Sequence, residues 1–342
     1  MSTTRKLRWG ILGTAQIALN RLVPAMRESQ FNEAAAIASR DGAKAREIAE
    51  KLGIPAAYGS YDELLADETI DAVYVPLPNH LHKKWAIRAA EAGKHVLCEK
   101  PISLTEREAR EIAEACERNG VHLAEALMYR HHPRYAMIRD LIAAGEIGKI
   151  RTMHLTFRYN MDDFMSPDNI RLKREFGGGA LYDVGCYCIS AARMLLGREP
   201  VAVTYQAVRS PEHDHVDVTG TGLLEFPGGI GVTFSCGMNT YSSNTIQIVG
   251  SKGTIDIPVA FLSIPALSPH FHLTKGAPGP AMERREVEVP AVNPYAAQAD
   301  DFARTVLFGE PAAFGPADAI ANMRVIDACL RSEYEGKRII LQ

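Results

Sequence analysis

The chain has 342 residues, of which 46% are hydrophobic and 23% are charged, and its formal net charge is -3 at pH 7. This length predicts two domains, and the composition is ordinary for a globular protein with a sizeable core. The charge excludes the basic footprint of a protein that binds DNA or RNA. Residues 1–8 are polar and basic, without an apolar stretch long enough for a signal peptide or membrane span, so we expect a cytoplasmic protein.

Six cysteines are spread along the chain without the dense spacing of a disulfide scaffold, so we expect reduced and mostly buried thiols. Cys186 and Cys188 would point in different directions on a helix, which does not suit a zinc site. His213 and His215 lack a grouping of further ligands and are expected in loops. We therefore predict no metal site.

The first part of the chain alternates short apolar runs with helical patterns, which is typical of a parallel sheet with crossover helices. Thr105 followed by Glu108 has the spacing of a capping box and supports a helix start. We predict a dinucleotide-binding Rossmann domain, a doubly wound α/β sheet, over residues 1–126. Its expected strands are Leu7–Leu12, Glu33–Ser39, Ala72–Val75, His95–Cys98 and Val121–Ala126, and its expected helices end near Glu28 or span Ala43–Leu52, His80–Ala92 and Thr105–Asn119.

After Met128 the pattern changes to alternating apolar runs separated by turns such as Pro227-Gly228-Gly229. We predict a second, α+β domain over residues 127–342 with a large, mainly antiparallel open sheet. The Pro- and Gly-rich piece 263–280 is expected to be a loop or an irregular edge. The expected strands are Ile150–Tyr159, Val201–Val208, Thr219–Phe226, Ile230–Gly237 and Thr245–Val249, and the expected helices are Pro133–Ala144, Ala180–Leu196, Tyr295–Phe308 and Pro316–Glu335.

The turn from Gly13 to Ala18 sits where a dinucleotide fingerprint belongs, directly after the first strand and at the start of the first helix. Gly13 permits the tight turn, and the small Ala15 lets the backbone approach a pyrophosphate. Ala15 replaces the second glycine of the strict pattern, so a generic strand-to-helix turn stays open as an alternative. The residues predicted to bind the cofactor here are Gly13, Thr14, Ala15, Gln16 and Ile17.

Cofactor choice is read at the end of the second strand, where an acidic residue would accept the ribose hydroxyls of NAD. Ser39 and Arg40 stand there instead, and a hydroxyl followed by a guanidinium suits the 2'-phosphate of NADP. Lys44 adds a positive charge one helical turn on. We predict NADP as the cofactor, and Asp41 keeps NAD open as an alternative.

Two further strand ends lie at the carboxyl edge of the predicted sheet, where such folds bind their ligands. Lys100 precedes a proline, which restricts its backbone and aims its ammonium group in a defined direction. From a cleft, this ammonium could polarise a substrate oxygen and lower the pKa of a nearby tyrosine. The residues predicted at the cofactor from these two strand ends are Leu77, Pro78, Asn79, His82, Glu99 and Lys100.

A run of three glycines, 177–179, opens a predicted helix that carries a carboxylate and a phenol four residues apart. On a regular α-helix, Asp183 and Tyr187 lie on one face, one turn apart, and can reach the same small molecule. A free tyrosine, with a pKa near 10, is a sluggish base. Tyr187 therefore needs a positive charge such as Lys100 close by, and without it a buried structural tyrosine is the better interpretation.

With these motifs the chain resembles the Gfo/Idh/MocA oxidoreductases, a family that includes glucose-fructose oxidoreductase, inositol dehydrogenase and dimeric dihydrodiol dehydrogenase. The likeness covers essentially the whole chain. It is carried by the Gly13 turn, Pro78-Asn79 with His82, Glu99-Lys100-Pro101, the Gly177 run with Asp183, and the late turn Gly250-Ser251-Lys252-Gly253-Thr254.

The resemblance implies roles for four residues and a metal-free enzyme. Lys100 would contact both the nicotinamide and the reacting oxygen, and Asp183 would bind substrate hydroxyls. Arg171 falls where relatives place an arginine near the cofactor. The proton donor or acceptor of the family is histidine in the inositol dehydrogenase branch, and Tyr187 in its place brings this chain nearer the tyrosine branch, which includes NADP-dependent xylose dehydrogenase.

We therefore expect an NADP-dependent oxidoreductase that moves hydride between nicotinamide and an aldose carbon. Reduction of a keto sugar such as 1,5-anhydrofructose and oxidation of a cyclic trans-diol are the alternatives within the enzyme class. A non-catalytic NADP-binding regulator is the alternative from another class. An open face on the second sheet would need covering, so we also expect a homodimer or higher homo-oligomer through that sheet.

Overall fold

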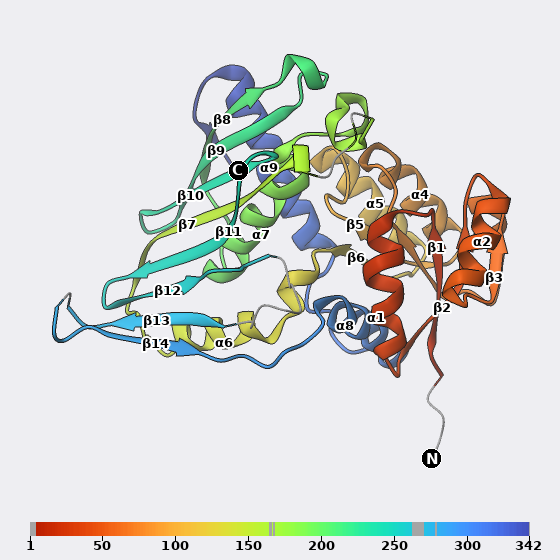
Figure 1. The fold of residues 1–342 in the computed structure, drawn as a ribbon, viewed down its shortest axis with the longest axis horizontal. Helices are drawn as coiled ribbons and strands as arrows, with labels where there is room; N and C mark the ends of the chain where they lie inside the picture. The colour runs from red at the N-terminus through yellow and green to blue at the C-terminus, as the bar shows by residue number, and fades with distance from the viewer. Residues whose placement is uncertain (1–4, 164–165, 167, 262–269, 278, 342) are drawn as a thin grey trace. The chain divides into compact units, whose positions relative to one another are not determined.

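The computed structural model describes residues 5–163, 166, 168–261, 270–277 and 279–341, and these form two compact units (Figure 1). The first unit comprises Met1–His131 and Asn293–Met323, and the second comprises His132–Val292 and Arg324–Gln342.

The first unit contains a six-stranded parallel sheet in the order β3-β2-β1-β4-β5-β6. This is the strand order of a doubly wound Rossmann sheet, so the predicted fold of the N-terminal part is confirmed. The short strand β3 was not expected from the sequence. The strands are β1 (Leu7–Leu12), β2 (Asn32–Ala38), β3 (Ala56–Tyr58), β4 (Ala72–Val75), β5 (His95–Glu99) and β6 (Leu123–Ala126).

Helices connect these strands and begin largely where the sequence predicts. Thr105 caps its helix by accepting a hydrogen bond from the Glu108 amide at 3.2 Å, and the Glu108 carboxylate accepts from the Leu104 amide at 3.1 Å. The first crossover helix opens with a π-helical turn at Ala18–Leu22. The helices of this unit include α1 (Val23–Glu28), α2 (Gly42–Leu52), α3 (Tyr61–Leu65), α4 (Asn79–Glu91), α5 (Glu106–Arg118) and α8 (Pro294–Phe308).

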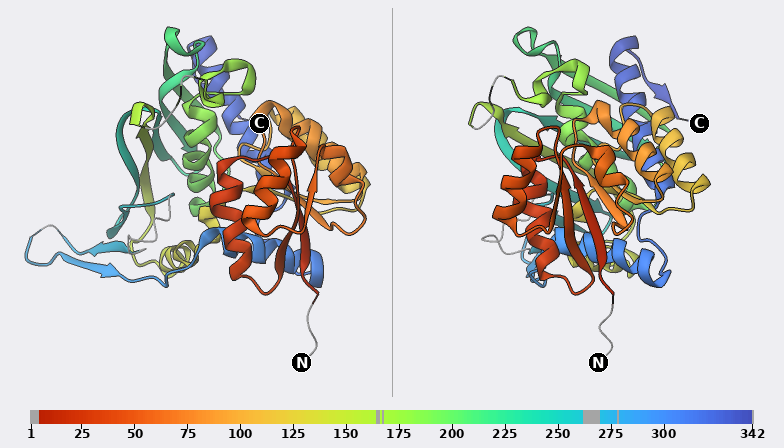
Figure 2. Two further views of the ribbon diagram at one scale, coloured as in Figure 1. Left: turned by 45° about the vertical axis from the view of Figure 1, so that its right-hand side comes forward. Right: turned by 90° about the vertical axis from the view of Figure 1, so that its right-hand side faces the viewer.

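Helix α8 belongs to the first unit, although the sequence analysis assigned residues 127–342 to a second domain. Its Phe302 packs on Trp9 of β1 with ring centroids 4.8 Å apart, and both side chains are almost completely buried. The Trp9 indole donates to Asn32 at 2.7 Å, and Asn32 in turn donates to Asp300 of α8 at 2.9 Å. Helix α8 therefore lies against the first sheet, although it comes late in the sequence (Figure 2). The contact between large aromatic rings stabilises this packing.

The second unit is built on a nine-stranded sheet in the order β14-β13-β12-β11-β7-β10-β9-β8-β15. Among the described residues of this sheet, β7 and β10 are the one parallel pair and the other pairs are antiparallel, which confirms the predicted mainly antiparallel sheet. The strands are β7 (Ile150–Asn160), β8 (Ala202–Arg209), β9 (Asp217–Phe226), β10 (Ile230–Gly237), β11 (Asn239–Gly250), β12 (Gly253–Ile257), β13 (Phe271–Lys275), β14 (Glu283–Val287) and β15 (Ile339–Ile340).

One prediction for this sheet was wrong, because the piece expected to be a loop or irregular edge contains strand β13. The rest of that expectation falls partly on residues 262–269 and 278, outside the described residues. Strand β14 was missed because Glu283–Val287 carries four charges in five residues and has no alternating pattern. Charged side chains are common on edge strands because they discourage further strand pairing.

The faces of the second sheet differ in polarity. Met153, Leu155 and Phe157 of β7 are buried, and helix α7 (Cys186–Leu196) contacts β7 and β10 (Figure 1). The alternate residues Thr152 and His154 are half-buried and exposed. This alternation is that of a sheet with one covered face. The remaining helices are α6 (Pro133–Ala143) and α9 (Pro316–Glu335).

All six cysteines are buried, as predicted, and none forms a disulfide bond with another. Burial raises the pKa of the Cys116 and Cys236 thiols to about 12, so both are protonated near pH 7. Among the described helices, none combines the length and apolarity that crossing a membrane requires.

Phe302→Ala would leave a cavity beside Trp9, and we expect it to lower the free energy of unfolding by about 3–5 kcal/mol. Denaturant unfolding followed by tryptophan fluorescence measures this change. Phe308→Ala on the same helix is the control, because Phe308 is 47% exposed and its loss should cost about 1 kcal/mol or less. Equal effects of the two substitutions would contradict the role assigned to α8.

Candidate active site

The turns that follow β1, β2, β4 and β5 leave the sheet of the first unit at one edge, because parallel strands end on the same side. Gly13 has φ +105°, a backbone conformation that favours glycine, and its amide donates to the Ala38 carbonyl at 2.9 Å. An added Cβ would lie 3.0 Å from the Leu77 side chain. Glycine therefore lets the turns after β1 and β4 approach each other closely.

This edge fits a dinucleotide. Thr14, Ala15 and Ile17 are half-buried and Gln16 is exposed, so the turn presents small or polar groups. The first amides of a helix have no partner within it and attract a phosphate. The helix that follows begins with a π-helical turn, which the sequence analysis did not foresee.

At the end of β2, a positively charged side chain is exposed, and the carboxylate next to it already accepts hydrogen bonds. Ser39 is buried, and its hydroxyl accepts from the Asp41 amide at 3.2 Å. The Asp41 carboxylate caps α2 by accepting from the amides of Ala43 at 3.0 Å and Lys44 at 3.1 Å. Arg40 and the Lys44 side chain are exposed.

Hydrogen bonds to Glu99 fix the end of β5. Glu99 accepts a hydrogen bond from the Tyr74 hydroxyl and a weaker one from the Lys100 amide at 3.3 Å. Pro101 follows through a cis peptide bond, and Lys100 is half-buried.

His82 is completely buried, and its two ring nitrogens lie 2.8 Å from the Pro101 carbonyl oxygen and 2.7 Å from the Leu77 carbonyl oxygen. The ring thus links the loops after β4 and β5. Burial lowers the pKa of His82 to about 4, so the ring is neutral and donates a hydrogen bond to one of these two carbonyls. Its predicted contact with the cofactor stays a prediction. Pro78 and Asn79, at the start of α4, are half-buried at the same edge.

A polar cluster of three side chains lies in the second unit, at the start of the helix that the glycine run opens. Asp183 accepts from the Arg171 guanidinium at 2.8 Å through one oxygen and from the Tyr159 hydroxyl at 2.6 Å through the other. The Asp183 carboxylate raises the pKa of Arg171, so the arginine stays charged. Burial, with the Asp183 charge, raises the pKa of Tyr159, so this phenol stays protonated and donates.

Tyr187 follows this cluster by one turn. Its side chain is 7% exposed and packs edge-on against Phe157 and Phe261, with ring centroids 5.2 and 5.8 Å away. Arg171 interacts electrostatically with Tyr187 as well as with Asp183. Residues Leu181–Gly185 form a π-helical turn, wider than an α-helical one, so the offset between Asp183 and Tyr187 differs from that of the expected regular helix.

Tyr159 completes this cluster and was not predicted from the sequence. Tyr159 lies near the end of strand β7, and only the packing of that strand against the helix start brings it to Asp183. Arg171, expected near the cofactor, forms its ion pair within the second unit.

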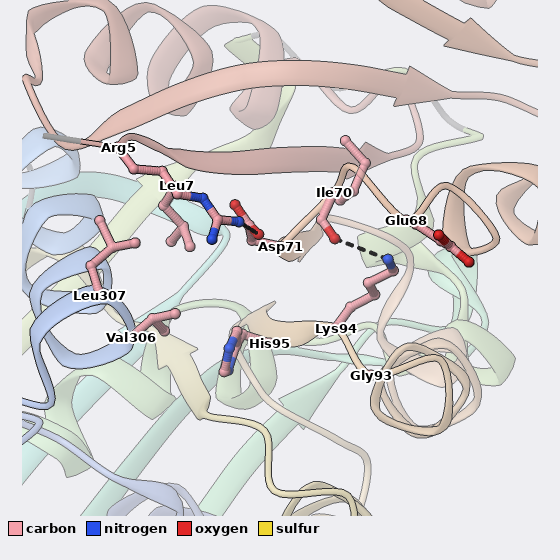
Figure 3. Close-up of a pocket in the computed structure, with 10 residues that line it drawn as sticks. All are labelled: Arg5, Leu7, Glu68, Ile70, Asp71, Gly93, Lys94, His95, Val306 and Leu307. Carbon is pink, nitrogen blue, oxygen red and sulfur yellow. Dashed lines mark hydrogen bonds and ion pairs between the residues drawn. The ribbon is translucent and has the colours of Figure 1, made fainter. Parts of the chain in front are cut away.

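A cavity of about 400 Å³ lies at the opposite edge of the first sheet, among the amino ends of β1, β4 and β5 (Figure 3). Three of the charged groups that line it already have partners: the Lys94 ammonium donates to the carbonyls of Asp67 at 2.7 Å and Ile70 at 2.9 Å, and Arg5 pairs with Asp71. Parallel sheets bind ligands at the carboxyl ends of their strands, so we do not assign this cavity to the cofactor.

One group of metal-ligand type occurs among the described residues, although the sequence analysis found none. It consists of His270, His272 and Glu286 on the β13–β14 edge. The two imidazoles lie 3.9 and 3.6 Å from the same carboxylate oxygen, too far for hydrogen bonds. The Nδ1 atom of His270 lacks the hydrogen-bond partner that usually orients a metal-binding histidine, so we assign no metal.

The chain is similar to known oxidoreductases along nearly its whole length. Residues 7–127 match the description "Oxidoreductase family, NAD-binding Rossmann fold", and residues 135–256 match "GFO/IDH/MocA C-terminal domain". The D-xylose 1-dehydrogenase (NADP(+)) 2 of Haloferax volcanii is 37% identical over 98% of this chain and 100% of its own.

Two solved structures share the fold. An aldose-aldose oxidoreductase from Caulobacter crescentus, complexed with glycerol, has a TM-score of 0.89 and 30% identity over 98% of this chain and 100% of its own. A variant of a 3-ketoreductase from Actinomadura kijaniata, in complex with TDP-benzene and NADP, has a TM-score of 0.89 and 31% identity over 96% of this chain and 98% of its own. The chain therefore belongs to the Gfo/Idh/MocA oxidoreductase family, and it is an NAD(P)-dependent dehydrogenase or reductase that acts on CH-OH groups.

Proposed function

We propose that the protein is an NADP-dependent oxidoreductase of an aldose-type sugar, with Tyr187 as the proton donor or acceptor and Lys100 as its assisting cation. The observation that carries the proposal is the cluster of Arg171, Asp183 and Tyr159 one turn before Tyr187. It combines hydrogen-bonding groups for hydroxyls with a tyrosine suited to proton transfer. A bound nicotinamide would supply the hydride acceptor or donor.

The choice between the two tyrosines follows from their surroundings. Tyr159 donates to an anionic carboxylate, which favours its protonated form and makes it a poor proton source. Tyr187 lies in the field of Arg171 and makes edge-on ring contacts. Lys100, on the family's motif, would bring a second positive charge to its hydroxyl, which favours the phenolate and speeds proton transfer.

Asp183 would hold a substrate hydroxyl. The hydrogen bonds from Arg171 and Tyr159 fix the orientation of its carboxylate, and a carboxylate accepts hydrogen bonds from hydroxyl groups. The names of two relatives support an aldose as substrate, since one is a xylose dehydrogenase and another an aldose-aldose oxidoreductase.

NADP is the proposed cofactor because Asp41, the acid that could bind the ribose hydroxyls of NAD, caps helix α2 instead. Asp41 accepts two backbone amides, while Arg40 and Lys44 are exposed beside it. Arg40 also interacts with the phenol of Tyr61, whose oxygen lies 3.5 Å from where a Cβ of Gly13 would be. The remaining cofactor contacts predicted from the sequence stay predictions.

Reduction of a keto sugar is the second candidate, and the fold shared with the 3-ketoreductase favours it. Turnover assays with aldoses and NADP, and with keto sugars and NADPH, separate the two reactions.

We also propose that a homo-oligomer forms through the open face of the nine-stranded sheet. The exposed residues of this face include the polar His154, Thr233 and Gln247 and the apolar Val208 and Leu223, so it offers both polar and apolar contacts to a second copy.

Tyr187→Phe removes the transferable proton, and we expect kcat with an aldose and NADP to fall by about 100-fold or more. The dissociation constant of NADP, measured by fluorescence titration, should not change. Tyr135→Phe is the matched control, because Tyr135 is a buried tyrosine of the same unit that donates to the Ala260 carbonyl at 2.7 Å. Turnover of Tyr187→Phe within a few-fold of the parent enzyme would remove the proposed role.

Arg40→Ala should raise the KM of NADP by about 10- to 100-fold, because a charge-assisted hydrogen bond to the 2'-phosphate contributes about 1.5–3 kcal/mol. The KM of NAD should stay the same, since NAD lacks that phosphate. Arg46→Ala, another exposed arginine of this region, is the control. A parent enzyme that turns over only with NAD would contradict the cofactor assignment.

Sedimentation velocity at micromolar protein concentration should show a species of at least twice the 37.5 kDa chain mass. Thr233→Arg, in the middle of the open face, should shift this species towards the monomer, because it places like charges opposite each other. Glu117→Arg on α5 of the first unit is the control. A parent protein that sediments as a monomer at all concentrations would contradict the proposed oligomer.

A further inference from the structure

A buried carboxylate outside the polar cluster lies directly against the start of the helix segment that carries the cluster. Asp217 is the first residue of β9 and is 3% exposed. It accepts a hydrogen bond from the Leu181 amide at 2.7 Å and a longer one from the Tyr205 hydroxyl at 3.3 Å. The Leu181 amide is one of the helix-start donors that have no partner within the helix.

The same carboxylate explains the last glycine of the run. A Cβ on Gly179 would lie 1.9 Å from an Asp217 oxygen, and Gly179 has φ +116°. The Gly179 amide donates to the Arg171 carbonyl at 3.0 Å, and its own carbonyl accepts from the Asp183 amide at 3.0 Å. Asp217 therefore contacts the one turn that holds the backbones of both Arg171 and Asp183.

This placement is costly for an acid. Burial raises the pKa of Asp217 to about 6, although the hydrogen bond from Leu181 and the charge of Arg209 oppose the rise. Near pH 7 the group is mainly a carboxylate, which the positive end of the helix dipole also favours. The other ionisable groups that face it are Tyr205 and Arg209 of β8, Cys236 of β10 and Glu333 of α9.

We propose that Asp217 is a positioning residue that holds the first turn of this helix segment so that Asp183 and Tyr187 keep their catalytic orientation. The proposal rests on the roles proposed above for those two residues. Burying the Asp217 carboxylate costs folding free energy, and its volume requires glycine at position 179. Such a residue is better explained by its effect on the geometry of the site than by a gain in stability. Asp217 acts through the backbone and touches no substrate.

Asp217→Ala and Asp217→Asn test the proposal, with Asp256→Ala as control. Asp256 is a half-buried acid of the same sheet that accepts from the Gln247 side chain at 2.7 Å and does not contact this helix. Backbone hydrogen exchange over Leu181–Tyr187, kcat, and the dissociation constant of NADP are measured on the full chain. Asp217→Ala should speed exchange in that segment and lower kcat at least tenfold, while NADP binding stays unchanged.

Asp217→Asn should restore slow exchange and most of kcat, because its amide oxygen still accepts from Leu181. Unchanged exchange in Asp217→Ala, or faster exchange with an unchanged kcat, would overturn the proposal. So would an Asp217→Asn variant that is as slow as Asp217→Ala despite parent-like exchange, because that result assigns Asp217 a chemical role. The exchange measurement needs no substrate, so it tests the role of Asp217 in the helix backbone by itself. The activity of Tyr187→Phe separately tests the proposed function.

Discussion

The polar cluster of the second unit depends on one close backbone approach, between the glycine run and the segment that carries Arg171. A Cβ on Gly178 would lie 2.4 Å from the Arg171 carbonyl oxygen, so only glycine allows the contact. The approach is held by the Gly178 amide, which donates to the Lys173 carbonyl at 3.0 Å. The absence of a side chain at this point is what brings a guanidinium from one segment to a carboxylate on the next helix.

A partly buried ion pair such as Arg171 with Asp183 is stable only when its remaining hydrogen-bonding capacity is used. Tyr159 donates to the second carboxylate oxygen, and the proposed function adds a substrate hydroxyl as a further donor to Asp183. Sugars offer many hydroxyls in fixed positions, and each can donate one hydrogen bond to such a carboxylate. The same cluster thus stabilises the charge without a ligand, and its carboxylate is the proposed partner of a polyhydroxylated substrate.

The parts of the fold predicted well from sequence are those whose apolar runs end at glycine or proline. Strands β1, β4 and β10 and helix α9 have the predicted bounds, and Gly13 and the glycine run were found because their turns require glycine. Strand β14 and the residues Tyr159 and Asp217 were not found. Their contacts depend on strand register and on packing between segments distant in sequence. A local sequence pattern predicts neither of these.

The proposed choice of NADP depends on the helix-capping role of one side chain at this edge of the first sheet. Asp41 is the acid nearest the position where NAD-dependent folds bind the ribose diol, but its carboxylate satisfies two amides at the start of α2. Turning it towards a ribose would leave those amides without their cap, at a cost of about 0.5–2 kcal/mol. A 2'-phosphate needs no such change, because Arg40 is already exposed and the negative charge of Asp41 is partly balanced by the helix start it caps. The helix cap therefore supports the proposed choice of NADP without any new contact.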